Sequence, residues 1–144
     1  MGQQVKVYRE LQLLNSAIIT TNKDMVIVDD ELVSKKTQTA VTGAATLTIT
    51  AAQLITGVLD STPTENSAYT LPTASLLVGE IANSKVGSSF FFVVNNKSAF
   101  IVTVGAGSSG TADGTLSVAA GVIRSFLIII TNVSSPAYYV YGIE

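Results

Sequence analysis

Three glycines have the spacing in this chain that most closely matches a chemical motif. Gly105, Gly107 and Gly110 follow the Gly-x-Gly-x-x-Gly pattern with which dinucleotide-binding enzymes hold a pyrophosphate. That chemistry needs a strand before the motif and a helix that begins at its last glycine, because the helix N–H groups and dipole bind the phosphate. The preceding residues alternate as a strand does, but the chain then passes another turn glycine, Gly114, into a further alternating segment. We therefore interpret residues 105–114 as a loop between strands and predict no cofactor.

The remaining polar residues offer little to catalysis. The sequence has no histidine and no cysteine, which removes the commonest general base and the usual transition-metal ligands. Its one acidic cluster, Asp29-Asp30-Glu31, lacks the spacing of a calcium-binding EF-hand loop, so we interpret it as a solvated turn. The serines and threonines have no evident activating base. We predict that the chain is not an enzyme and that it has no metal site.

Aromatic residues near the end of the chain leave a carbohydrate-binding module as the alternative function. Tyr138, Tyr139 and Tyr141 are candidate glycan contacts, together with loop residues such as Asn96, because tyrosine rings can hold sugar rings. Tyr138 and Tyr139 fall on opposite faces of a predicted strand, so core and subunit contact is the interpretation that we prefer. Asn96 and Asn132 each begin an Asn-x-Ser sequon, and we interpret both as turn residues.

Charge is scarce and unevenly distributed. Hydrophobic residues make up 47% of the 144 residues and charged residues 12%, whereas a typical soluble domain has about 25% charged residues. Residues 1–44 hold ten of the eighteen charged side chains. A body so poor in charge favours permanent self-association that covers apolar surface. The net charge of −2 gives no reason to expect nucleic acid as a partner.

No segment predicts a membrane span or an export signal. The longest apolar runs, Phe90–Val94 and Phe126–Ile130, are far shorter than the roughly 20 residues of a membrane helix. The first residues do not combine a basic segment with an apolar stretch and a cleavage site. We therefore expect no membrane partner and no signal peptide.

Short alternating segments separated by turns predict an all-β body. Two similar stretches, which start at Ser89 and Ser125, each predict a hairpin with an asparagine in its turn. Their continuous apolar runs predict strands covered on both faces, by a second sheet or by a neighbouring subunit. The candidates for core or subunit contacts are Leu47, Ile49, Phe91, Val93, Leu127 and Ile129.

One short helix and an N-terminal arm complete the expected architecture. Thr73 is a predicted N-cap, followed by apolar residues at helical spacing. Residues 1–40 contain a predicted hairpin of Ala17–Thr20 with Met25–Val28, and we expect them to form an arm or base for attachment and oligomer contacts. Residues 41–144 are expected to form the body. The expected fold is a jelly-roll-like antiparallel β-sandwich.

Several stretches between residues 43 and 143 resemble a family of small virion proteins of tailed phages and other large DNA viruses. The stretches are TLTITAAQLITGVL, YTLPTASLLVGEI, VGSSFFFVVNN, VGAGSSGTADGTLSV, RSFLIIITNV and AYYVYG. The resemblance implies a β-rich capsid decoration, spike or head-fibre protein that forms a homotrimer on the virion surface. It also implies that residues 1–40 bind the major capsid protein or another virion protein. It transfers no catalytic residue, and a host-surface glycan is the partner only in the carbohydrate-binding alternative.

Overall fold

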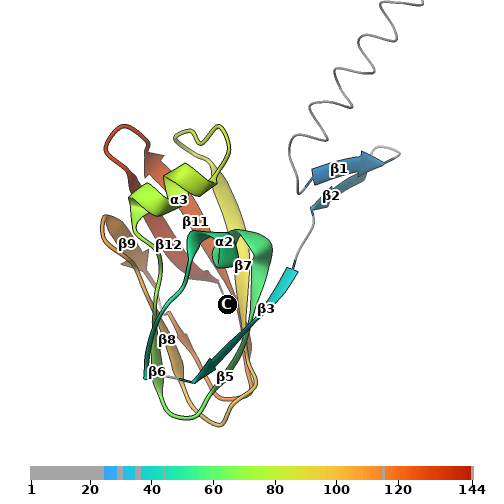
Figure 1. Cartoon of the computed structure of the whole chain (residues 1–144), viewed down its shortest axis with the longest axis vertical. Helices are drawn as coiled ribbons and strands as arrows, with labels where there is room; N and C mark the ends of the chain where they lie inside the picture. The colour runs from blue at the N-terminus through green and yellow to red at the C-terminus, as the bar shows by residue number, and fades with distance from the viewer. Residues whose placement is uncertain (1–24, 29–30, 35–36, 44, 115, 144) are drawn as a thin grey trace, which may run out of the picture. The chain divides into compact units, whose positions relative to one another are not determined.

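A computed structural model describes residues 25–28, 31–34, 37–43, 45–114 and 116–143 (Figure 1). The chain divides into two units, residues 1–36 and residues 37–144, and each is described by itself. In the first unit β1 (Met25–Val28) pairs antiparallel with β2 (Glu31–Ser34). The segment 17–20, predicted as the partner of β1, lies outside the described residues, as do residues 29 and 30 of the acidic cluster.

The body begins a few residues earlier than the sequence predicts. Residues 37–40, assigned above to the arm, belong to strand β3 (Thr37–Gly43). This strand pairs in parallel with β5 (Gly57–Pro63) over its whole length, which places it in the main sheet of the body. The attachment role of residues 1–40 stays a prediction.

The larger sheet of the body has six strands in the order β3-β5-β7-β11-β12-β9. Strands β7, β11 and β12 pair antiparallel, whereas β3, β5 and β7 run parallel to one another and β9 runs parallel to β12. The strands not yet given bounds are β7 (Ser89–Asn96), β9 (Gly110–Asp113), β11 (Ile123–Asn132) and β12 (Ala137–Ile143).

The smaller sheet has four strands in the order β10-β8-β6-β4. Strands β4, β6 and β8 run parallel, and β10 pairs antiparallel with β8. The bounds are β4 (Thr46–Thr48), β6 (Ser67–Thr70), β8 (Val102–Gly105) and β10 (Ser117–Val118).

The protein is therefore mostly β, as predicted, but its sheets are mixed and not antiparallel throughout. From β3 to β8 successive strands alternate between the two sheets. The chain returns to each sheet in the same direction after every strand in the other sheet. For this reason β3, β5 and β7 align in parallel, and so do β4, β6 and β8. A jelly roll is built from antiparallel pairs, so this winding departs from that expectation.

The two similar apolar stretches, which start at Ser89 and Ser125, form different structures. The second forms the predicted hairpin, because β11 pairs directly with β12. The first does not: β7 joins the six-stranded sheet, and the chain then crosses to the other sheet as β8. The hairpin predicted from Ser89 is therefore wrong, although its turn residues match those of the second stretch.

The described residues contain two short helices, where one was predicted. Helix α2 (Ala51–Thr56) begins at a capping box of Thr50 and Gln53 and ends at Gly57, which has a φ of 97°. Helix α3 (Ala74–Glu80) begins at Thr73, which confirms the predicted N-cap. The helices contact each other; α2 packs on β3, β5 and β7, and α3 contacts β12.

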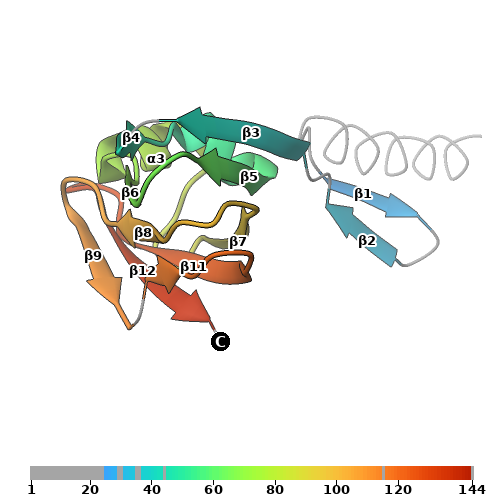
Figure 2. The same ribbon diagram turned by 90° about the horizontal axis from the view of Figure 1, so that it is seen from below.

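The core lies between the two sheets and under the helices (Figure 2). Ile49 is fully buried in it, and Leu47 packs against it half-buried. On the larger sheet the buried residues are the sequence neighbours of the predicted contact residues, for example Phe92 beside Phe91 and Phe126 beside Leu127. The rings of Phe92 and Phe126 stack, with their centroids 5.0 Å apart. The buried apolar residues of β7, β11 and β12 are Phe92, Val94, Phe126, Ile128, Ile130, Tyr138 and Val140.

Candidate functional site

The glycine motif forms a link between strands. Gly105 ends β8, Gly110 begins β9, and no helix follows the last glycine. The interpretation of residues 105–114 as a loop between strands is confirmed for residues 106–109 only, because Gly105 belongs to β8 and residues 110–113 form strand β9. The described structure around the motif lacks the helix that would bind a phosphate.

Close packing around Tyr138 and the β6–α3 connection accounts for two of the three glycines. The Tyr138 hydroxyl donates a hydrogen bond to the carbonyl oxygen of Pro72, at 3.1 Å, and accepts one from the N–H of Gly107, at 2.8 Å. A Cβ on Gly107 would meet the carbonyl oxygens of Leu71 and Pro72, and a Cβ on Gly110 would meet the Tyr138 ring. The spacing therefore lets the loop pack closely against β12 and the β6–α3 connection. Burial raises the pKa of the Tyr138 hydroxyl above its ordinary value.

The N-termini of both helices are already occupied by their own caps. The Thr50 hydroxyl accepts a hydrogen bond from the N–H of Gln53 at 3.2 Å, and the Thr73 hydroxyl accepts one from the N–H of Leu76 at 3.4 Å. These are the donor groups that would otherwise bind an anion. The two caps thus serve to stabilise the short helices.

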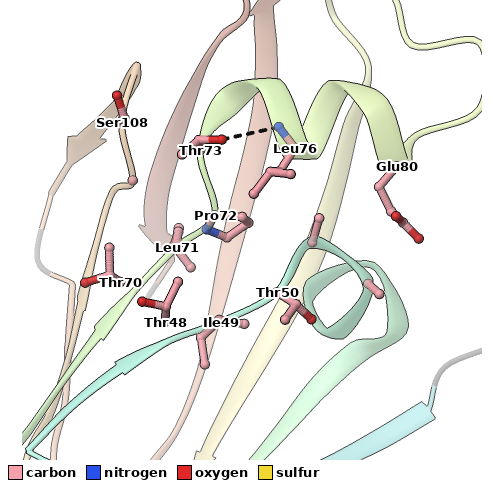
Figure 3. Close-up of a pocket in the computed structure, with 13 residues that line it drawn as sticks. Thr48, Ile49, Thr50, Thr70, Leu71, Pro72, Thr73, Leu76, Glu80 and Ser108 are labelled. Carbon is pink, nitrogen blue, oxygen red and sulfur yellow. Dashed lines mark hydrogen bonds between the residues drawn. The ribbon is translucent and has the colours of Figure 1, made fainter.

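A cleft of about 430 Å³ lies beside these caps (Figure 3). Figure 3 shows the hydroxyls of Thr70 and Ser108 on one side of it and the Glu80 carboxylate on the other. Across the described residues, no three acidic side chains gather to hold a metal ion. The cleft offers one carboxylate and no second acid or base, so it has no pair of groups for acid–base catalysis. It is lined by Thr48, Ile49, Thr50, Ala51, Ala52, Thr70, Leu71, Pro72, Thr73, Leu76, Glu80, Gly107 and Ser108.

Two of the four candidate glycan contacts are buried. Tyr138 is 1% exposed and Asn96 is 0% exposed, so neither reaches a glycan at the surface. This corrects the prediction for both residues. Tyr138 and Tyr139 lie on opposite faces of β12, as the sequence predicted. Tyr139 and Tyr141 face outward together, with ring centroids 5.9 Å apart.

The outer face of the six-stranded sheet gathers most of the predicted contact residues. Strand register aligns Phe91, Leu127 and Tyr141 in one row across β7, β11 and β12. In the next row towards the β7 C-terminus, Val93 and Ile143 flank Ser125 of β11. Phe91 is 53% exposed, and Val93 and Leu127 are half-buried.

A third row extends this face in the other direction. It aligns Ile129 with Tyr139, and Ile129 is half-buried. Phe91, Val93, Leu127 and Ile129 therefore lie outside the core, and whether they contact a subunit stays a prediction. We define the apolar face as Phe91, Val93, Ile123, Leu127, Ile129, Tyr139, Tyr141 and Ile143.

Two members of the apolar face were missed by the sequence analysis. Ile123 is 64% exposed and Ile143 is 38% exposed. Both stand at even spacing from predicted members of their own strands, Ile123 from Leu127 and Ile143 from Tyr141. Side chains two apart on a strand share a face, so this spacing was the signal that could have found them.

Charged groups stand at the margins of the apolar face. Asp60 on β5 lies beside Asn95 on β7, accepts a hydrogen bond from its amide at 2.7 Å, and forms an ion pair with Lys97. The Lys97 ammonium, helped by the Asn95 amide, holds the pKa of the Asp60 carboxyl below its ordinary value. Asp113 of β9 aligns with Tyr141 at the opposite margin.

The outer face of the smaller sheet has a different character. Register aligns Ser117, Thr103, Ala68 and Thr46 in one row, and all four are exposed. These side chains are small and mostly hydroxyl-bearing. The body thus exposes large apolar side chains on one sheet and small polar ones on the other.

Comparison with known proteins found no matching family model, no similar curated protein and no similar solved structure. Among the described residues, no helix has the length and apolar character needed to cross a membrane.

Proposed function

We propose that this chain is a structural protein of a virion surface, a capsid decoration, spike or head-fibre component that assembles as a homotrimer of β-sandwiches. The self-assembly is supported by the apolar face on β7, β11 and β12. Figure 2 labels these three strands. Large aromatic and aliphatic side chains exposed together mark a surface that binds another protein. The virion location is supported by the family resemblance described above.

The internal use of polar groups also supports a structural role. Asn96, Tyr138 and Asp60 each have several polar partners in the body, and those partners are groups of the same chain. Such networks hold loops and strands in place. Rigidity suits a particle surface, where the protein must persist and need not turn over a substrate.

Light scattering on the purified, untagged chain tests the self-assembly. We expect a stable particle of three times the 15.0 kDa chain mass in dilute solution. A mass of 15.0 kDa at micromolar concentration would contradict the proposal.

Particle attachment tests the virion location. Antibody labelling of intact virions should detect the chain at the surface, and we expect a chain without residues 1–36 to stop co-sedimenting with particles. The truncation falls at the boundary between the two units. Undiminished attachment of the truncated chain would show that residues 1–36 are not the attachment arm.

Glycan binding is the second candidate function, because Tyr139 and Tyr141 present stacked, partly exposed rings on the apolar face. Homotrimer contacts through this face would cover the same rings, so the two functions compete for one surface. A saturable glycan-array signal that is lost in the Tyr139→Ala variant, from a monomeric chain, would favour glycan binding.

A further inference from the structure

We infer that the apolar face is the surface through which copies of this chain meet, with β7, β11 and β12 of each copy turned towards a common axis. The inference rests on the proposed function and adds to it the site of contact. Figures 1 and 2 show these three strands side by side along one side of the body.

The centre of the apolar face has the composition of an interface core. Phe91 at 53% and Tyr139 at 38% are aromatic residues with large exposed fractions. They flank Leu127 and Ile129, which are half-buried. Aromatic residues are enriched and charged residues depleted in the cores of protein interfaces.

The apolar face has the size of the largest apolar patch on a typical protein surface, and such patches are often functional. Strands lie about 4.8 Å apart and rise about 3.3 Å per residue, so three strands of about seven residues cover roughly 330 Å². That area lies near the lower end of the range for the largest apolar patch on a monomer, about 300–600 Å². Contacts from the neighbouring strands β5 and β9 would extend it towards the roughly 800 Å² that each partner buries in a stable interface.

The charges of this face favour a second copy over a charged partner. Among the described residues of the six-stranded sheet, the outward-facing acids are Asp60 and Asp113, on strands at opposite sides of the apolar face. Lys97 already neutralises Asp60. The centre therefore carries no charge that an oppositely charged partner would match, and identical centres can meet without repulsion. A polar margin around an apolar centre is the usual arrangement at interfaces.

Single cysteines test this surface directly, because the natural sequence contains none. Phe91→Cys places a thiol on the apolar face, and Thr103→Cys places one on the exposed face of the smaller sheet. The assembled mass of each variant is measured first, and each thiol is then titrated with an aromatic disulfide reagent. We expect the thiol of Phe91→Cys to react about tenfold or more slowly than that of Thr103→Cys, because exposure governs thiol reactivity.

The outcomes separate the inference from the proposed function. A wild-type chain that is monomeric contradicts both. An assembled Phe91→Cys variant whose thiol reacts as fast as that of Thr103→Cys overturns the contact site and leaves the assembly standing. A Phe91→Cys variant that becomes monomeric, while Thr103→Cys remains assembled, supports the contact site.

A charge substitution gives a second readout that does not depend on thiol chemistry. Phe91→Lys should reduce the mass to that of one chain, whereas the matched control Thr103→Lys should retain the assembly. Both positions are exposed within one chain, so circular dichroism should show a folded protein in each case. A Phe91→Lys variant that keeps the full assembled mass would overturn the inference.

Discussion

Gly107 and Gly110 lie against Tyr138 and the β6–α3 connection with no space for a side chain. The phenol hydroxyl of Tyr138 bonds to both sides of this contact, the Gly107 N–H and the Pro72 carbonyl. Close packing against the Tyr138 ring and the Leu71–Pro72 backbone thus accounts for two of the three glycines.

Replacing Gly107 by alanine should destabilise the body. The new Cβ would lie 2.5 Å from the Pro72 carbonyl oxygen, so backbone must move. We expect Gly107→Ala to lower the free energy of unfolding by about 1–3 kcal/mol, the usual cost of overpacking. The measurement is urea denaturation followed by circular dichroism.

Gly79 provides the matched control. It lies within α3, and a Cβ there meets nothing within 4 Å. Gly79→Ala should stabilise the protein by about 0.5–1 kcal/mol, because alanine loses less backbone entropy in a helix. Equal effects of the two substitutions would contradict the packing role of Gly107.

The Tyr138→Phe variant distinguishes the contribution of the hydroxyl to stability from that of the ring. The ring still fills the space beside Gly110, but the Gly107 N–H and the Pro72 carbonyl lose their partner. We expect a loss of about 1–3 kcal/mol at neutral pH, the cost of leaving buried polar groups unpaired.

The same variant should also change how the free energy of unfolding depends on pH in the alkaline range. Burial raises the folded-state pKa of Tyr138, so its stabilising effect is complete below the unfolded pKa of about 10 and is lost as pH rises through the folded value. Stability measured from pH 8 upward should therefore fall less steeply in Tyr138→Phe than in the wild type. Parallel pH profiles would contradict this role of burial.

Asn96 ends β7 and directs the chain into the opposite sheet. Its buried amide nitrogen donates to the carbonyl oxygens of Phe100 at 2.7 Å, Ala119 at 3.0 Å and Val118 at 3.2 Å. Its carbonyl oxygen accepts a hydrogen bond from the N–H of Ser98 at 3.1 Å. One side chain thus joins the β7–β8 connection to the end of β10.

Asn96→Ala should therefore destabilise the body strongly. It leaves several carbonyl groups near Asn96 without their amide donor, and we expect a loss of about 2–3 kcal/mol in urea denaturation. The turn residue of the similar stretch, Asn132, is exposed and accepts one hydrogen bond, from the N–H of Ser135. Asn132→Ala should cost about 0.5–1 kcal/mol; a cost as large as that of Asn96→Ala would refute the distinction between the two turns.

Assembly of the whole molecule should depend little on salt. The apolar face carries its charges at its margins, and association there is driven by apolar burial, which ionic screening does not remove. We expect light scattering to give the same assembled mass between about 0.05 and 0.5 M sodium chloride. Dissociation as salt rises would indicate contacts made by charged residues, and would point away from β7, β11 and β12.

The sequence predicted what depends on near neighbours. The Thr73 cap, the β11–β12 hairpin and the strand character of the body can be predicted from short stretches of sequence. The lack of histidine and cysteine follows from composition alone. Capping and turn formation are hydrogen bonds within a few residues, so a local pattern is enough to predict them. The opposite facing of Tyr138 and Tyr139 likewise follows from the two-residue period of a strand.

Tertiary structure decided which sheet each strand joins and which side of an apolar run is buried. In a run such as Phe90–Val94 both sets of alternate residues are apolar, so periodicity cannot distinguish Phe92, in the core, from Phe91, at the surface. That choice depends on the register with β5 and β11, whose residues are distant in sequence. The crossing from β7 to β8 depends in the same way on carbonyl groups of Val118 and Ala119, more than twenty residues after Asn96.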